Sequence, residues 1–180
     1  MPNVILRLSG TFGSGKTTAV RKFIEDYPSE TLMGGKKIMG YRIDLTSLDV
    51  EKPLFIVGKY DNVCGGTDSI NTQLEVAERI IKAHALGHVL YEGALVSASG
   101  LGGKVTQIDT PQDKCIDRVI NRRLTAGNTK EFDPKNLVAK FGGVTACRQH
   151  VTEAGFRVVD VDHMNTHPPL VKIIKDFEIS

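Results

Sequence analysis

Residues 10–17 of this chain read Gly-Thr-Phe-Gly-Ser-Gly-Lys-Thr, which fits the pattern G-x-x-x-x-G-K-[ST] of a phosphate-binding loop, the P-loop. The pattern alone is only moderately specific, so the neighbouring sequence must show whether this stretch is a true P-loop. An apolar run of strand length, Asn3 to Leu8, precedes the loop, and apolar residues recur at helical spacing after it, from Val20 to Tyr27. Strand, glycine loop and helix follow one another in the order that a P-loop requires. The start of the chain is therefore predicted to bind a nucleotide.

The residue types in this loop explain how it would hold a nucleotide. Its glycines allow backbone N–H groups to turn inward around a phosphate, and the helix that follows adds the positive end of its dipole. Lys16 is expected to reach the β- and γ-phosphates, and the Thr17 hydroxyl to ligate Mg²⁺. The predicted nucleotide-binding residues are Gly10, Thr11, Phe12, Gly13, Ser14, Gly15, Lys16, Thr17 and Thr18.

Strand and helix patterns alternate along the rest of the chain. Strands are predicted at 3–8, 38–45, 53–60, 88–91, 104–109 and 156–161, with 28–37 as a loop. A first helix is predicted directly after the P-loop, and a second from a cap at Thr67 or Ser69 to about residue 85, with Ile70, Leu74, Ala77 and Ile81 on one face. A third helix follows the capping sequence 110–113. A fourth runs from Asp133 to near Gly155, with Gly142-Gly143 as a candidate break, and a fifth follows Pro168-Pro169. This alternation predicts an α/β fold of three layers, the P-loop NTPase fold, with a parallel sheet flanked by helices in one domain spanning 1–180.

The composition favours a globular protein over a membrane-spanning or disordered one. Apolar residues make up 41% and charged residues 24% of the chain. No apolar run approaches the ~18 residues that cross a membrane, and no signal peptide precedes the P-loop, so we expect a cytoplasmic protein with no membrane partner. The net charge of +2 neither requires nor excludes a nucleic-acid partner. The three cysteines lack metal-ligand spacing and are expected to be buried free thiols.

Acidic residues at the carboxyl ends of parallel strands are candidates for chemistry, because ligands bind at that edge of such a sheet. Glu92 directly follows an apolar strand and is the leading candidate for a catalytic base or an Mg²⁺ ligand, the alternative being a surface glutamate. Asp109 competes with it, although a helix-capping role explains that residue equally well. Asp61 and Asn62 are candidates for substrate recognition or, for Asp61, catalysis, against the alternative of a plain turn. Asp44 follows a weaker strand and is a minor candidate for the base or for the substrate side.

Three arginines lie on the helix that follows the capping sequence. Arg118 and Arg122 are one helical turn apart and are candidates for stabilising charge on a transferred phosphoryl group, while Arg123 is a weaker one. The alternative is a solvated helix face, which is the usual role of such a row. The polar segment around 122–135 is predicted to be a short lid.

These motifs resemble those of the nucleoside and nucleotide kinases among P-loop proteins. The resemblance covers most of the chain and is carried by the P-loop, the Y-D-N-V-C-G-G-T-D loop at 60–68, V-L-Y-E-G at 89–93 and the segments I-D-T-P and D-R-V-I-N-R-R. Gly93 stands where many of those kinases have an arginine, which argues against an ordinary free nucleoside or nucleoside monophosphate as the acceptor. The chain is more similar to small phage-encoded kinases that phosphorylate 5-hydroxymethyluracil in DNA, through L-S-G-T-F-G-S-G-K-T-T, C-G-G-x-D and E-G-x-L-V-S.

The resemblance implies an ATP- and Mg²⁺-dependent kinase that acts on a modified thymine in phage DNA, in the host cytoplasm. A kinase for free nucleosides or nucleoside monophosphates stays open as an alternative. A non-catalytic NTP-binding protein is the alternative of another class. The chain lacks the N-K-x-D signature of guanine-specific proteins, so ATP is the expected nucleotide.

Overall fold

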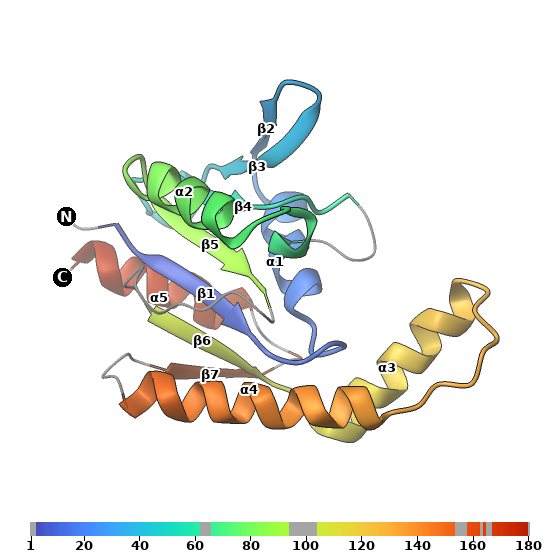
Figure 1. Ribbon diagram of the computed structural model, residues 1–180. Coiled ribbons are helices and arrows are strands. Elements are labelled where there is room, and N and C mark those ends of the chain that lie inside the picture. The colour runs from blue at the N-terminus through green and yellow to red at the C-terminus, as the bar shows by residue number, and fades with distance from the viewer. Residues whose placement is uncertain are drawn as a thin grey trace.

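In the computed structural model, one sheet organises the chain (Figure 1). The structure describes residues 3–61, 66–93, 104–153, 158–162, 164 and 167–179. Its strands are β1 (Ile5–Ser9), β2 (Ser29–Gly34), β3 (Lys37–Ile43), β4 (Leu54–Val57), β5 (His88–Glu92), β6 (Lys104–Asp109) and β7 (Val158–Asp162). Its helices are α1 (Lys16–Asp26), α2 (Gln73–His84), α3 (Gln112–Thr125), α4 (Lys135–Glu153) and α5 (His167–Ile179), with short 3-10 turns at Thr46–Leu48 and Thr67–Ser69.

The strand order places the P-loop at the middle of the sheet. The described strands run β2-β3-β4-β5-β1-β6-β7, and β4, β5, β1, β6 and β7 are mutually parallel. β1 is central and pairs with β5 on one side and β6 on the other. The loop after β1 therefore leaves the carboxyl edge between the ends of its two neighbours. The predicted three-layer α/β fold with a parallel sheet is confirmed in this core.

Helices cover both faces of the sheet, because each strand of the core carries apolar side chains on both sides. α1 and α5 pack on one face, where the fully buried Phe23 and Ile174 meet Leu6 and Leu90. α2 packs on the other face through Val76 and Ile80, and α4 lies in front of β7 in Figure 1. Each such buried side chain contributes roughly 1.5–3 kcal/mol. None of the described helices is long and apolar enough to cross a membrane.

The structure corrects the prediction for residues 28–45. The segment expected to be a loop contains β2, which forms an antiparallel hairpin with β3. Gly35 turns this hairpin with a φ of 63°, a conformation that suits glycine. β3 is also antiparallel to β4, so it is not part of the parallel core in which it was predicted. The hairpin stands out from the body of the molecule in Figure 1.

Several helix predictions also need correction. α2 begins at its cap Thr72 rather than near 67, and it buries Val76 and Ile80, while Leu74 and Ile81 of the predicted face are exposed. α4 runs without a break through Gly142-Gly143. α5 begins at His167, so the two prolines lie in its first turn, where their missing N–H groups cost nothing.

Candidate active site

The P-loop spans from the end of β1 to the start of α1 and is held in an open curve by its glycines. Gly10, Gly13 and Gly15 have φ values of 152°, 78° and 99°. At Gly13 a side chain has no room, because a Cβ there would lie 2.6 Å from the Cys115 carbonyl oxygen. The sequence motif is therefore explained by backbone conformation at all three glycines and by close packing against α3 at Gly13.

Lys16 lies inside the loop and is buried. Its ammonium group donates to the carbonyl oxygens of Gly10 and Thr11 at 2.9 and 2.8 Å. Burial lowers the pKa of Lys16 from its usual value, and the negative charge of Glu92 opposes that change. The cation is thus held beside the loop, where it can meet the charge of a phosphate.

Glu92 ends β5 next to β1, where it pairs in register with Leu8, and its side chain is buried. Its Oε1 accepts a 2.7 Å hydrogen bond from the Thr17 hydroxyl. Its Oε2 is buried and has no hydrogen-bond partner among the described residues. Burial raises the pKa of Glu92 to about 7, although the Thr17 hydroxyl and the Lys16 charge lower it. A carboxylate with such a pKa and a free oxygen can accept a proton near neutral pH.

A glycine from another loop closes over Glu92. Gly66 has a φ of 87°, and a Cβ there would lie 2.7 Å from Glu92 Cγ. The next residue, Thr67, is buried and donates its hydroxyl to the Glu92 carbonyl oxygen at 2.6 Å. The predicted recognition loop at 60–68 therefore touches the candidate base through its last residues.

Two residues that the sequence analysis did not assign to the site support the P-loop, one from the segment before α3 and one from α3 itself. Thr110 was predicted to cap that helix, but its buried hydroxyl donates to the Ser14 carbonyl oxygen at 2.8 Å, and Pro111 occupies the cap position without a side-chain cap. The Thr11 hydroxyl lies 3.4 Å from Cys115 Sγ. Cys115 is a buried free thiol, as was expected of all three cysteines; Cys64 and the side chain of Cys147 lie outside the described residues. The signal for Thr110 was its position immediately after the core strand β6, at the edge where the P-loop lies, whereas Cys115 lies inside α3 and had no such signal.

The arginines of α3 lie in different surroundings. Arg118 donates to the Gly13 carbonyl oxygen at 3.1 Å, so it contacts the P-loop directly. Arg122 lines a pocket next to Thr11 and Phe12. Arg123 instead lies over the Phe132 ring, with 5.4 Å to the centroid, and holds the segment between α3 and α4. The roles predicted for Arg118 and Arg122 in phosphoryl transfer stay predictions.

The other candidates for the base or for substrate recognition are Asp61, Asn62, Asp109 and Asp44, and those that the structure describes lie in different places. Asp61 lies beyond the carboxyl end of β4, is exposed, and forms a 3.0 Å ion pair with Lys59. Asn62 lies outside the described residues, and of Asp109 the structure describes only the backbone, at the end of β6. Asp44 lies at the other edge of the sheet, because β3 runs antiparallel and ends beside the start of β4. Asp44, the minor candidate for the base or the substrate side, therefore lies away from the P-loop, and its carboxylate accepts from the Thr46 N–H at 2.9 Å, which lowers its pKa.

Comparisons with known proteins agree with this geometry. No protein-family model matches the chain. The chain is 32% identical over 173 residues to a 5-hmdU DNA kinase of Pseudomonas phage PaMx11, an alignment that covers 88% of this chain and 90% of that protein. It is 25% identical over 177 residues to a 5-hmdU DNA kinase of Delftia phage PhiW-14, which covers 84% of this chain and 65% of that protein. The chain belongs to the 5-hmdU DNA kinase family. The predicted resemblance to P-loop kinases of phages is confirmed, and the chain is a phosphotransferase of that kind.

One further residue in this 5-hmdU DNA kinase family member lies near the base and was not predicted. Arg21 follows Thr17 by one helical turn, and its positive charge lowers the pKa of Glu92. Its Nε donates to the Tyr60 carbonyl oxygen at 3.1 Å, which ties α1 to the segment after β4. The four-residue spacing from Thr17 was a usable signal, because residues at i and i+4 share a helix face.

Proposed function

We propose that this protein transfers the γ-phosphoryl group of ATP to the hydroxymethyl oxygen of 5-hydroxymethyluracil in DNA. Membership of the 5-hmdU DNA kinase family supports the acceptor. The observation that carries the proposal is the contact between Thr17 and the buried carboxylate of Glu92, 2.7 Å apart, next to Lys16 in a P-loop. This arrangement supplies charge for the phosphates and a carboxylate for the acceptor in one place. Both relatives are phage proteins, which supports action in the cytoplasm of an infected host.

The transfer needs a base, a phosphate clamp and charge compensation. In the proposed step the hydroxymethyl oxygen attacks the γ-phosphorus, the bond from that phosphorus to the bridging oxygen breaks, and ADP leaves with the electron pair. Glu92 Oε2 takes the hydroxyl proton, and the product is a phosphomonoester on the base. Lys16 stabilises the charge on the transferred group, and Arg118 and Arg122 are positioned to assist from α3.

Thr17 and Glu92 would also hold Mg²⁺. A hydroxyl and a carboxylate are the oxygen ligands that this ion prefers, and the unpartnered buried Oε2 of Glu92 fits a cation as well as a proton. When bound, Mg²⁺ would neutralise the β- and γ-phosphate oxygens. Both roles of Glu92 need the ionised carboxylate. We therefore expect kcat/KM for ATP to rise with pH through about 7, since kcat/KM reports the ionisations of the free enzyme.

The decisive experiment offers ATP labelled on its γ-phosphate together with different acceptors. These acceptors are hydroxymethyluracil DNA, the same DNA with thymine, and free nucleosides and nucleotides. We expect label only in hydroxymethyluracil DNA, only with Mg²⁺, and none with a Lys16→Ala protein purified in the same way, which controls for contaminating kinases. Label in free nucleotides would instead indicate a nucleotide kinase. ATP binding without any transfer would indicate a non-catalytic NTP-binding protein.

A further inference from the structure

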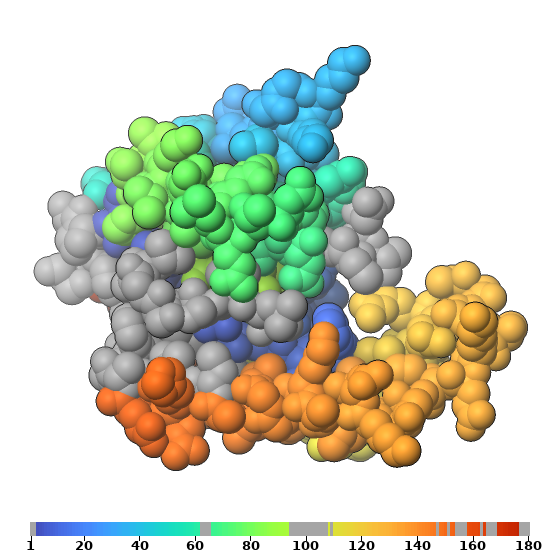
Figure 2. All heavy atoms as spheres, viewed as in Figure 1, coloured from blue at the N-terminus to red at the C-terminus, as the bar shows by residue number. Residues whose placement is uncertain are grey.

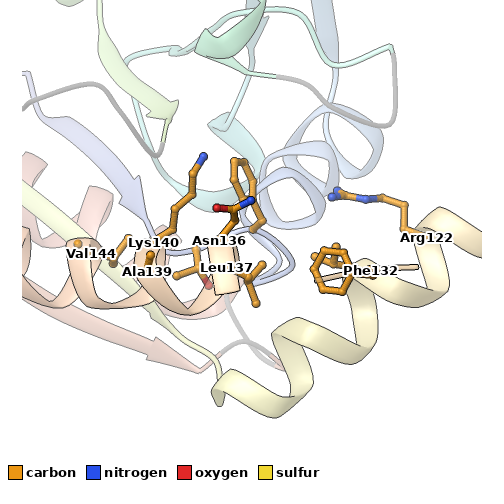
Figure 3. Close-up of a pocket in the computed structure, with 11 residues that line it drawn as sticks. Arg122, Phe132, Asn136, Leu137, Ala139, Lys140 and Val144 are labelled. Carbon is orange, nitrogen blue, oxygen red and sulfur yellow. The ribbon is translucent and has the colours of Figure 1, made fainter. Parts of the chain in front are cut away.

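A pocket of about 850 Å³ lies between the P-loop, α3 and α4, apart from the loop interior that holds Lys16 (Figure 3). Its apolar wall includes Leu137 and Val144, and its polar groups come from Arg122, Asn136 and Lys140. Small-molecule sites in proteins have volumes of about 300–1,000 Å³ and this mixture of an apolar lining with a few polar groups. The pocket is therefore large enough for a nucleobase with its sugar. Figure 2 shows the α3–α4 arm that forms one side of it, in yellow and orange, next to the P-loop in blue.

The aromatic and charged groups of this pocket suit a nucleotide in particular. Phe12 and Phe132 contribute aromatic rings from the P-loop and from the segment before α4. The Lys140 ammonium lies over the Phe12 ring, 4.0 Å from its centroid. In Figure 3 the Asn136 amide lies between the charged ends of Lys140 and Arg122. Rings stack on bases, an amide can pair with a base edge, and the Lys140 ammonium can contact a phosphate of the strand.

The position of the pocket along the P-loop indicates which substrate it serves. Lys16, the residue that reaches the β- and γ-phosphates, contacts the carbonyl oxygens of Gly10 and Thr11. Thr11 also lines the pocket. The pocket thus adjoins the end of the loop at which the γ-phosphate is expected. A group bound there would face the transferred phosphoryl group rather than the base of ATP.

We propose that this pocket is the acceptor subsite and that it takes one pyrimidine base turned out of the DNA strand. The inference rests on the function proposed above and adds where the acceptor binds. A stacked base cannot enter a pocket, so the nucleotide is extruded or single-stranded when it binds. Phe12 and Phe132 contact the base, Asn136 pairs with its edge, and Lys140 binds a neighbouring phosphate of the strand, while Arg122 contacts the transferred phosphoryl group.

The test compares two pocket variants with two matched controls. Phe132→Leu removes a ring and Lys140→Ala a charge from the pocket. The controls, Phe141→Leu and Lys135→Ala, make the same changes on α4 outside the pocket. We would measure the Kd of each protein for a fluorescent single-stranded hydroxymethyluracil oligonucleotide, its Kd for a non-hydrolysable ATP analogue, and its thermal midpoint. We expect the oligonucleotide Kd to rise about tenfold in both pocket variants, and the other values to stay within about twofold of wild type.

Three outcomes would overturn the subsite. Weaker binding of the ATP analogue in the pocket variants would make the pocket the adenine site. An equal loss of oligonucleotide binding in Lys140→Ala and Lys135→Ala would indicate general charge attraction. Unchanged oligonucleotide binding in the pocket variants would exclude the site. Because binding is measured without turnover, these results remain distinct from failure of the proposed kinase activity, which would appear as absent transfer by the wild-type protein.

Discussion

Replacing Glu92 by Gln should stabilise the nucleotide-free protein above neutral pH while abolishing phosphoryl transfer. The amide keeps the shape of the carboxylate but carries no charge and accepts no proton from the acceptor. The wild-type side chain is buried, and burial raises its pKa from 4.5 to about 7. An ionised carboxylate at this position therefore costs free energy in the folded state that the amide does not cost.

The magnitude and its sign follow from proton linkage. Because the folded pKa lies above the unfolded one, the folded protein binds the proton more tightly. The contribution of Glu92 to the free energy of unfolding of the wild-type protein is then largest below pH 4.5. This contribution falls as the pH rises and levels off above about 7. A pKa change from 4.5 to about 7 corresponds to roughly 3 kcal/mol, since each tenfold change in proton affinity is worth about 1.4 kcal/mol. The Glu92→Gln protein does not lose this free energy of unfolding as the pH rises, because its amide does not ionise.

Urea denaturation of both proteins at a series of pH values measures this difference. We expect the free energy of unfolding of Glu92→Gln, relative to wild type, to increase by roughly 3 kcal/mol between pH 4.5 and pH 8. Glu78→Gln, on the exposed face of α2, is a matched control and should show no such trend. Parallel pH curves for wild type and Glu92→Gln would refute the reasoning. They would mean that Glu92 is not held in an environment that penalises its charge.

Further variants test the other parts of the site. Lys16→Ala should lower kcat by a factor on the order of 10² or more in a protein that remains folded, as circular dichroism can show, because it removes charge that stabilises the transition state. If Asp61 contacts the acceptor, Asp61→Asn should chiefly raise the acceptor KM in steady-state kinetics, whereas Asp44→Asn, at the opposite edge of the sheet, should leave kcat and both KM values unchanged. Thr110→Val should raise the KM for ATP and reduce the free energy of unfolding by about 1–3 kcal/mol, because it leaves the Ser14 carbonyl oxygen without its buried donor; wild-type values in both assays would contradict this.

The sequence predicted the parts of the site that local patterns specify. The P-loop could be recognised because its glycines, lysine and threonine follow one another within eight residues, between a strand and a helix. Glu92 could be recognised because it directly follows an apolar strand. Both inferences depend only on neighbouring residues and on the rule that parallel strands present their carboxyl ends at one edge. The structure brings these residues together through the pairing of β5 with β1.

The local sequence pattern could not predict the direction in which each strand runs. Asp44 follows a strand just as Glu92 does, but β3 is joined to β2 by a tight turn and runs antiparallel to β4. The polar sequence of β2 hid the hairpin, because its exposed position removes the apolar alternation that marks a strand. Thr110 was misassigned for a related reason. A threonine before a helix is an ordinary cap, and only the approach of the P-loop gives its hydroxyl a different acceptor.

The pKa changes of Lys16 and Glu92 can be understood together once the binding of a substrate is considered. Without a nucleotide, burial lowers the pKa of Lys16 and raises that of Glu92, so each charge is disfavoured even though the other partly offsets it. A triphosphate beside Lys16 and a cation beside Glu92 would each supply the missing opposite charge. The free energy that the empty site costs is thereby recovered on binding, and the affinity for the nucleotide is correspondingly improved. It follows that the pH dependence of wild-type stability should flatten when ATP and Mg²⁺ are both present, because Glu92 is then ionised across the whole neutral range.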